Sequence, residues 1–253
     1  MTVDVLDTLP ARWRVDRMMM GDRSRWGSVE VRGDDDGLLL LLGDADRPTL
    51  FGRGDPDRVA GLVDGLDLDG AAWMSVPRGC TPAPDALQRL GLVAFSTWDW
   101  LSTDAAPDVV PGEERVRRLD HVTDAAAIRA CLRDSNPGTS ADPAVPGELG
   151  WWGVEADGAL VGVVGAAERA GLGDGLSWHV HGLGVLPGLR GTGTGTALAA
   201  VVTRAGLAAG ADWVSLGMYA SNDGARRIYR RLGFRTDAEL TSFSPTGAGR
   251  PPA

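Results

Sequence analysis

The chain of 253 residues contains no lysine, so all 25 of its basic residues are arginines. This absence excludes Walker-type phosphate loops and lysine Schiff bases, because both need a lysine amine. Cysteine is scarce too, since Cys80 and Cys131 lie far apart and form no Cys-x-x-Cys pair. Neither a disulfide framework nor a thiolate metal cluster is predicted, and a reducing compartment is expected.

Long apolar runs and a secretory signal are missing as well. No run approaches the ~20 apolar residues that a membrane span needs. The first ten residues carry Asp4 and Asp7 where a signal peptide would carry positive charge. The net charge of -9 argues against non-specific binding to nucleic acid. We therefore expect a cytoplasmic protein, monomeric or homodimeric, with neither a membrane nor nucleic acid as partner.

What the chain does contain is an alternation of strand and helix patterns, which predicts an α/β fold. In the N-terminal half we expect strands at 38–42, 71–76 and 92–98, a helix starting at Asp55-Pro56, and a second helix at 84–90. Residues 103–112 are rich in proline and small residues and are typical of a linker. We place a domain boundary there and expect two domains, at 1–112 and 113–245.

The C-terminal half follows the same alternation. Strands are predicted at 114–119, 176–185, 213–218 and 238–243, and Asp157-Gly158 predicts a hairpin joining 151–155 to 160–167. Helices are predicted around Ile128 to Leu132, Leu198 to Ala205 and Ala225 to Leu232. Residues 134–150 are expected to form a long loop, and residues 246–253 a disordered tail.

A glycine-rich loop separates the strand at 176–185 from the following helix. Gly191, Gly193 and Gly195 stand where backbone N–H groups and a helix dipole can receive a phosphate. Such turns also occur for conformational reasons alone. Thr196 stands where a dinucleotide-binding Gly-x-Gly-x-x-Gly would have its last glycine, which argues against a Rossmann site.

The segment LGVLPGLRGTGTGTAL resembles the acyl-CoA motif of the GNAT N-acetyltransferase superfamily, Arg/Gln-x-x-Gly-x-Gly/Ala, through Arg190, Gly193 and Gly195. A second pattern of that family, Asn-x-x-Ala-x-x-x-Tyr-x-x-x-Gly-Phe, is matched from Asn222 to Phe234. The resemblance covers about residues 113–245. The N-terminal half lacks the acyl-CoA motif and is interpreted as a degenerate GNAT-like domain.

The resemblance implies a mixed central sheet flanked by helices and acetyl-CoA as cosubstrate. It places the pyrophosphate on the loop at 190–196 and the pantetheine arm along the strand near Leu183 to Val185, with a backbone N–H near Val185 polarising the thioester. The implied cofactor-binding residues are Leu183, Gly184, Val185, Arg190, Gly191, Thr192, Gly193, Thr194, Gly195, Thr196 and Asn222.

His179 and His181 are two residues apart on a predicted strand, so their side chains leave from one face. An amine attacks a thioester only when neutral, and histidine is suited to accept the ammonium proton near neutral pH. This His-x-His is similar to that of the arylalkylamine-type acetyltransferases. Two alternatives stay open: ordinary buried or surface histidines, and a metal site, which would still need further ligands. We expect no metal.

Tyr229 falls where GNAT enzymes place a hydroxyl near the CoA sulfur, and the resemblance implies a general acid there. The same position also belongs to the apolar face of its helix, so a core residue is the alternative. We favour the catalytic role, because the sequence has only two tyrosines, Tyr219 and Tyr229, and this one falls in register with the motif. Glu168 is an alternative base acting through water. Trp151, Trp152 and Trp178 could line an aromatic pocket, although core packing is the more common role of such residues.

These features predict an acetyl-CoA-dependent N-acetyltransferase that acts on a small-molecule primary amine by direct transfer in a ternary complex. The expected catalytic residues are His179, His181 and Tyr229. The acceptor is expected between the loop at 134–150 and the face that carries the histidines. Two other functions remain open, a CoA-binding sensor or scaffold without turnover and a protein or peptide N-acetyltransferase.

Overall fold

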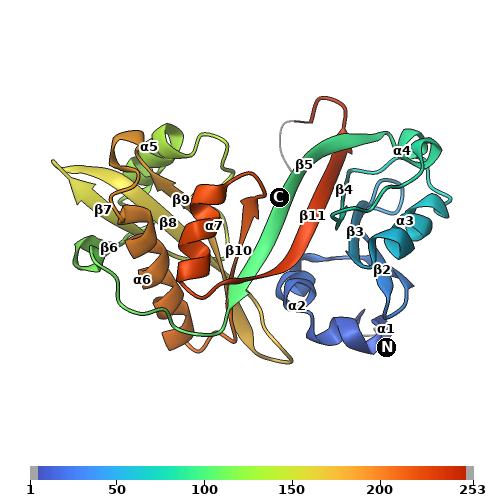
Figure 1. Ribbon diagram of the computed structural model, residues 1–253, viewed down its shortest axis with the longest axis horizontal. Helices are drawn as coiled ribbons and strands as arrows, with labels where there is room; N and C mark the ends of the chain where they lie inside the picture. Colours follow the sequence, from blue (N-terminus) through green and yellow to red (C-terminus); the bar gives the residue numbers. More distant parts are fainter. Residues whose placement is uncertain (1–4, 249–253) are drawn as a thin grey trace. The chain divides into compact units, whose positions relative to one another are not determined.

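The computed structural model describes residues 5–248 of the chain (Figure 1). By its internal contacts the chain divides into two compact units. Unit 1 holds the described residues up to Trp100, Tyr219–Ser221 and those from Asp237 on, and unit 2 holds Leu101–Met218 and Asn222–Thr236. Of the predicted tail at 246–253, residues 249–253 lie outside the described part of the chain.

Unit 1 begins with short helices and continues as a mixed sheet. Its strand order is β1-β2-β3-β4-β11-β5. The helices are α1 (Val5–Thr8), α2 (Arg17–Asp22), α3 (Pro56–Asp64) and α4 (Pro84–Leu90), with 3-10 turns at Ala11–Val15 and Arg23–Arg25. The strands are β1 (Val29–Gly33), β2 (Gly37–Leu42), β3 (Thr49–Gly54), β4 (Trp73–Pro77), β5 (Leu92–Thr103) and β11 (Arg235–Pro245).

Local sequence explains the helix boundaries of unit 1. The Asp55 side chain accepts from the N–H groups of Asp57 and Arg58 and so caps α3, which starts at Pro56 as predicted. At the end of α4, Gly91 adopts a left-handed φ of 68°. The early helices and strands β1 and β3 have no counterpart in the sequence prediction. Strand β3, TLFGRG, contains two glycines, which are rare in strands.

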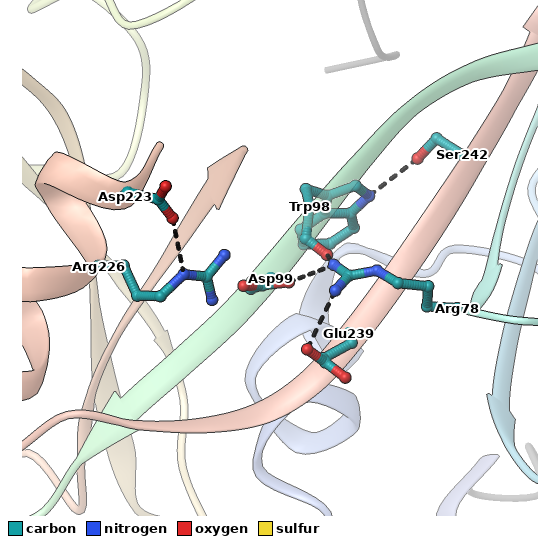
Figure 2. A network of polar contacts seen from close by, with 7 residues as sticks. All are labelled: Arg78, Trp98, Asp99, Asp223, Arg226, Glu239 and Ser242. Atoms are coloured by element: carbon teal, nitrogen blue, oxygen red, sulfur yellow. Dashed lines mark hydrogen bonds and ion pairs between the residues drawn. The ribbon is translucent and has the colours of Figure 1, made fainter. Parts of the chain in front are cut away.

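A polar network ties β4, β5 and β11 together within unit 1 (Figure 2). The guanidinium of Arg78 pairs with fully buried Asp99 and with Glu239, at 3.0 Å from the latter. The indole of Trp98 donates to Ser242 Oγ at 2.8 Å. These contacts satisfy a carboxylate that would be costly to bury alone, so the network has a structural explanation.

Unit 2 contains the sheet order β10-β9-β8-β7-β6 with three main helices. Its strands are β6 (Val116–Leu119), β7 (Glu148–Ala156), β8 (Ala159–Ala170), β9 (Leu176–Val185) and β10 (Val214–Tyr219, within the unit as far as Met218). Its helices are α5 (Ala125–Ser135), α6 (Thr194–Ala208) and α7 (Asp223–Arg231), with 3-10 turns at Glu113–Arg115 and Pro187–Leu189.

Helices cover both faces of the unit 2 sheet (Figure 1). On one face α6 packs through Leu198 and Val202 against Trp152, Trp178 and Val180. On the other face α5 packs through Ile128, Cys131 and Leu132 against Trp151 and Val163. Adjacent residues such as Trp151 and Trp152 thus face opposite ways, as strand geometry requires. The face under α5 is called the α5 face below.

The mixed α/β fold class is confirmed, and most elements of unit 2 lie where the sequence predicted them. Strand β9 has its predicted bounds, and the hairpin turn at Asp157 and Gly158 uses positive φ angles of 51° and 77°. The division into units, however, falls after Trp100 rather than near residue 112, and the chain from Asp237 on groups with unit 1. Strands β5 and β11 each run from one unit into the other, which no local composition signals.

Candidate functional site

The two histidines lie on the α5 face of unit 2, where His179 belongs to a row of side chains that crosses four strands. Glu148 on β7 is opposite Ala167 on β8, Ala167 is opposite His179 on β9, and His179 is opposite Ser215 on β10. Facing residues of neighbouring strands lie on one side of a sheet, so this register brings together two polar side chains and an imidazole.

His181 lies in the neighbouring row, opposite Gly165, which is itself opposite Trp151. Its imidazole packs edge-on against the Trp151 indole, with the ring centroids 5.4 Å apart. As the spacing predicted, both histidines share a face, while Trp178 and Val180 point to the opposite side. Trp151, Trp152 and Trp178 are all buried core residues.

Polar contacts distinguish the two histidines. His179 Nδ1 lies 3.0 Å from Ser215 Oγ, a neutral partner whose hydroxyl also reaches the Trp178 carbonyl at 3.3 Å. His181 Nε2 lies 3.0 Å from Oε1 of Glu148, at ion-pair distance but not in hydrogen-bond geometry. The side chain of Glu148 is only 7% exposed. One imidazole therefore faces a hydroxyl and the other a buried carboxylate.

The sequence analysis did not identify Glu148 as a site residue. The sheet has two irregularities near the histidines, and the first of them explains why Glu148 was missed. The β7–β8 register shifts between Glu148 and Gly150, so the extra residue Leu149 moves Glu148 onto the same face as Trp151. The β8–β9 register shifts between His181 and Gly184, where two residues of β9 oppose one of β8. Such bulges redirect side chains and are common beside active sites.

The bulge in β9 is held in place from α5. The side-chain amide of Asn136 donates to the Leu183 carbonyl at 3.3 Å. Gly184 is buried beneath Ser135, and a Cβ at Gly184 would collide with the Ser135 hydroxyl. The parallel pairing of β10 with β9 runs as far as Leu216, opposite Val180, while β9 continues to Val185. The stretch of β9 that was predicted to hold the pantetheine arm, Leu183 to Val185, therefore lies beyond this pairing with β10.

The glycine loop leads into the first turn of α6, as predicted. Gly191 and Gly193 have left-handed φ angles of 81° and 92°, and Gly193 is the N-cap residue without a side-chain cap. No atom lies within 4 Å of a Cβ added at either glycine, so both positions are open. Together with the positive end of the helix dipole, this arrangement suits an anionic group.

The other predicted cofactor-binding residues have contacts of their own. Arg190 donates through Nε to the Val185 carbonyl and through Nη2 to the Ser135 carbonyl, at 3.2 and 3.0 Å. Thr192 Oγ1 donates to Leu189 and lies 3.0 Å from Thr194 Oγ1. These bonds fix the loop on the end of β9. The remaining members of the predicted set at this loop are Gly195, beside Val185, and Thr196, half-buried in the first turn of α6.

The residues of the second motif lie on α7. Asn222 is the N-cap residue of this helix, and its side chain accepts from the Ala225 N–H at 3.0 Å. Tyr229 is buried in the core of unit 2 and packs edge-on against Phe234, with 5.5 Å between centroids. Burial raises the pKa of the Tyr229 hydroxyl well above its ordinary value, which keeps the proton on the oxygen.

Two further expectations concern Glu168 and metals. Glu168 is exposed and stands opposite Trp178, so it lies on the other side of the sheet from the histidines. Over residues 5–248, no group of three or more metal-ligating side chains occurs, and no helix is long and apolar enough to cross a membrane.

The loop that precedes β7 is tied to α5. Arg129 on α5 forms two hydrogen bonds of 2.7 Å with the Asp142 carboxylate. This pairing lowers the pKa of Asp142 to about 2. Ala141 packs into the same apolar cluster as Trp151. The loop thus lies next to the face that carries His181, where the acceptor was predicted.

Comparisons with solved structures show how widely this fold occurs. A GNAT-family protein from Novosphingobium aromaticivorans is 26% identical over 96% of this chain and 100% of its own, with a TM-score of 0.56. A GCN5-related N-acetyltransferase from Kribbella flavida is 21% identical over 94% and 97%, with a TM-score of 0.58. One from Sphaerobacter thermophilus is 15% identical over 95% and 93%, with a TM-score of 0.55.

Sequence comparison relates one part of the chain to a known family. Among curated proteins none matches the sequence. Residues 122–234 match the Acetyltransferase (GNAT) family, and this range contains both histidines, the glycine loop and Tyr229. GNAT acetyltransferases transfer an acetyl group from acetyl-CoA to an acceptor. Residues 122–234 of the chain therefore form a domain similar to the GNAT acetyltransferases.

Proposed function

We propose that this protein is an N-acetyltransferase that transfers acetyl from acetyl-CoA to a small-molecule primary amine, by direct attack in a ternary complex. The observation that carries the proposal is the placement of His179 and His181 on one face, directly before the β9 bulge and the glycine loop. A base, an acyl-donor strand and an anion-binding turn then follow one another along 18 residues, 178–195.

The residues present fit the proposed cosubstrate. Gly191 and Gly193 leave their side-chain positions open, and α6 presents its uncapped N-terminus to the same point. We infer that the loop at 190–196 and Leu183 to Val185 hold acetyl-CoA, which supplies a thioester carbonyl as acyl donor. A backbone N–H near Val185 would donate to that carbonyl oxygen as negative charge develops there. Asn222, the N-cap residue of α7, would contribute to this site by fixing the start of that helix.

The chain's own groups account for the two proton transfers. An imidazole of the His-x-His pair removes the ammonium proton of the acceptor, which frees the nitrogen lone pair to form the new N–C bond. The C–S bond breaks, and the Tyr229 hydroxyl gives its proton to the departing sulfur. Because burial keeps the Tyr229 hydroxyl protonated, its protonation state suits this role.

We also infer a cytoplasmic location, since Cys80 and Cys131 are both free thiols.

The test combines binding and turnover. Calorimetry should show that acetyl-CoA binds, and thiol release should follow when members of a panel of small primary amines are added. The double variant His179→Ala/His181→Ala should bind acetyl-CoA as the wild type does but lose turnover, by about 10²- to 10⁴-fold for a general base. Binding without turnover on any amine would favour a sensor or scaffold, and turnover on peptides alone would favour a protein N-acetyltransferase.

A further inference from the structure

Helix α7 and the turn after it carry the densest group of arginines in the sequence. Five of the 25 arginines lie at residues 226–235, a stretch that contains no acidic residue, although the chain has a net charge of -9. Arg227, Arg230 and Arg231 are exposed, and none of the three forms a hydrogen bond or an ion pair with another described residue. Arg129 on α5, by contrast, pairs with a carboxylate. The outer side of α7 therefore presents unpaired positive charge, which is suited to an anionic ligand.

Helical geometry divides the arginines of α7 into two rows. At about 100° per residue, Arg227 and Arg231 lie one above the other, on the exposed flank of the helix beside Ile228. Arg226 and Arg230 form a second row, which is turned away from Ile228. The pair Arg227 and Arg231 is called the arginine row below.

Ile228 brings the arginine row next to the glycine loop. Helices α6 and α7 pack against each other within unit 2 (Figure 1). A Cβ added at Gly195, in the first turn of α6, would lie 3.7 Å from Ile228 Cδ1. Gly195 belongs to the loop at 190–196 that is proposed to hold the pyrophosphate of acetyl-CoA. The flank of α7 beside Ile228 therefore borders that loop.

Coenzyme A carries a 3′-phosphate in addition to its pyrophosphate. Both groups are attached to the same ribose, so a pyrophosphate at the start of α6 keeps the 3′-phosphate near that turn. At pH 7 a phosphate monoester has a charge of about −1.5 to −2. The loop itself has one basic residue, Arg190, whose Nε and Nη2 donate to the carbonyls of Val185 and Ser135. A second phosphate needs further positive charge, and because the chain has no lysine, arginines must supply it.

We propose that Arg227 and Arg231 bind the 3′-phosphate of coenzyme A and make the protein selective for coenzyme A over 3′-dephospho-coenzyme A. This inference rests on the proposed function, because it takes the loop at 190–196 as the pyrophosphate site. Guanidinium groups suit a phosphate monoester, since their N–H groups can bond two phosphate oxygens at once. Like charges four residues apart on a helix repel each other, and a dianion bound between them offsets that repulsion.

A structural role does not account for both residues of the arginine row. Basic side chains in the last turn of a helix interact favourably with its dipole, and Arg230 and Arg231 lie in that turn. Arg227 lies in the middle of the nine-residue helix, where this effect has faded. Asp223, the one acidic residue of α7, pairs with Arg226 at 3.8 Å instead of with Arg227 (Figure 2). The charge of Arg227 therefore has no role in the helix itself.

Calorimetry with two ligands tests the assignment without turnover. We expect the wild type to bind coenzyme A at least about tenfold more tightly than 3′-dephospho-coenzyme A, as hydrogen bonds to a charged group allow. The double variant Arg227→Gln/Arg231→Gln should lose at least about tenfold in affinity for coenzyme A and less than about threefold for the dephospho form. Arg227→Lys/Arg231→Lys keeps both charges and should retain part of the preference. Arg230→Gln is the matched control, because it removes an exposed charge from the other row of the same helix.

Equal affinity of the wild type for the two ligands would overturn the inference without any variant, and would leave the arginine row a solvated helix face. An equal loss for both ligands in the double variant would also overturn it, as would the same loss of preference in Arg230→Gln. A preference for coenzyme A that depends on the arginine row, with no amine acetylated, would support the subsite while the proposed function fails. Acetylation of amines with the same kcat/KM for acetyl-CoA and its 3′-dephospho form would support the proposed function while the subsite fails.

Discussion

Gly165 lies directly opposite His181 in the β8–β9 ladder, and the imidazole occupies the space that a side chain at residue 165 would fill. A Cβ at Gly165 would approach His181 Cε1 to 2.6 Å and Trp151 Cε2 to 2.8 Å. Real Cβ atoms do not come so close, so any larger residue must displace one of the two rings. The glycine is thus a condition for the observed position of the imidazole.

We therefore predict that Gly165→Ala lowers kcat for amine acetylation by about tenfold or more. Overpacking of this kind costs typically 1–3 kcal/mol, so the variant should still fold, with a modestly lower Tm. Steady-state kinetics together with thermal unfolding check this. Gly61→Ala is the control, because no atom lies within 4 Å of a Cβ there, on helix α3. Wild-type kcat in a folded Gly165→Ala would show that the imidazole position does not matter.

A second glycine substitution tests the acyl-CoA loop. Gly193 has a φ of 92° and no close neighbours, so alanine there meets backbone strain but no steric clash. Such strain costs on the order of 1–3 kcal/mol, and relief by movement of the loop would misplace the N–H groups at the start of α6. We expect Gly193→Ala to weaken acetyl-CoA binding about tenfold by calorimetry.

Gly188 supplies the matched control for that experiment. It lies five residues earlier in the same connection, in the 3-10 turn at Pro187–Leu189, and has neither a left-handed φ nor an atom within 4 Å of an added Cβ. Gly188→Ala should bind acetyl-CoA like the wild type. Equal losses in both variants would mean that the connection responds to any substitution, and would remove the argument for a specific anion site at Gly193.

The sequence was sufficient for those parts of unit 2 that obey a simple period. Strand β9, the Asp157-Gly158 hairpin and helix α7 follow from alternation, turn residues and helical spacing. The shared face of His179 and His181 follows from the same period of two. In unit 1, by contrast, β3 and the helices before residue 25 carry weak local signals and were missed.

Glu148 shows why the site could be predicted only in part. Strict alternation along Glu148, Leu149, Gly150 and Trp151 would put the carboxylate and the indole on opposite faces. The extra residue in β7 reverses this, and only the pairing with β8 reveals it. A bulge depends on the register between strands that are distant in sequence, so the residues themselves do not announce it. The same holds for Asn136, which reaches the bulge in β9 from the end of α5.

The buried thiols make the stability of the protein sensitive to alkaline pH. Burial, together with the charges of Asp64 and Asp57, raises the pKa of Cys80 to about 12 from a usual value near 9. Between these values the unfolded chain has lost the thiol proton and the folded chain has kept it. Since the unfolded state then binds fewer protons, the free energy of unfolding falls as pH rises above about 9.

Urea unfolding followed from about pH 8 to about pH 11 should therefore show a falling midpoint, and Cys80→Ala should reduce the slope of that fall. Cys131 contributes in the same direction, because burial raises its pKa as well. A thiol reagent added to the native protein should react slowly with both cysteines, which are 5% and 3% exposed. Rapid labelling of Cys80 in the folded state would contradict this account.

Tyr229 separates packing from catalysis most directly, because its ring and its hydroxyl have different tasks. The ring packs against Phe234 in the core of unit 2, and phenylalanine preserves that contact. The hydroxyl is the proposed proton donor to sulfur. Tyr229→Phe should thus lower kcat by about 10²-fold or more, within the range of general-acid catalysis, with Tm close to that of the wild type.

The pH dependence of Tyr229→Phe adds a second criterion. Burial keeps the hydroxyl protonated far above neutral pH, so loss of the acid should lower kcat across the whole range from about pH 6 to about pH 9 and leave the shape of the profile unchanged. Tyr229→Ala, which removes the ring too, should instead lower Tm, since it deletes a buried aromatic at a cost of about 3–5 kcal/mol. Full activity in a stable Tyr229→Phe would leave the residue a purely structural role, and the proton for the sulfur would then have to come from water.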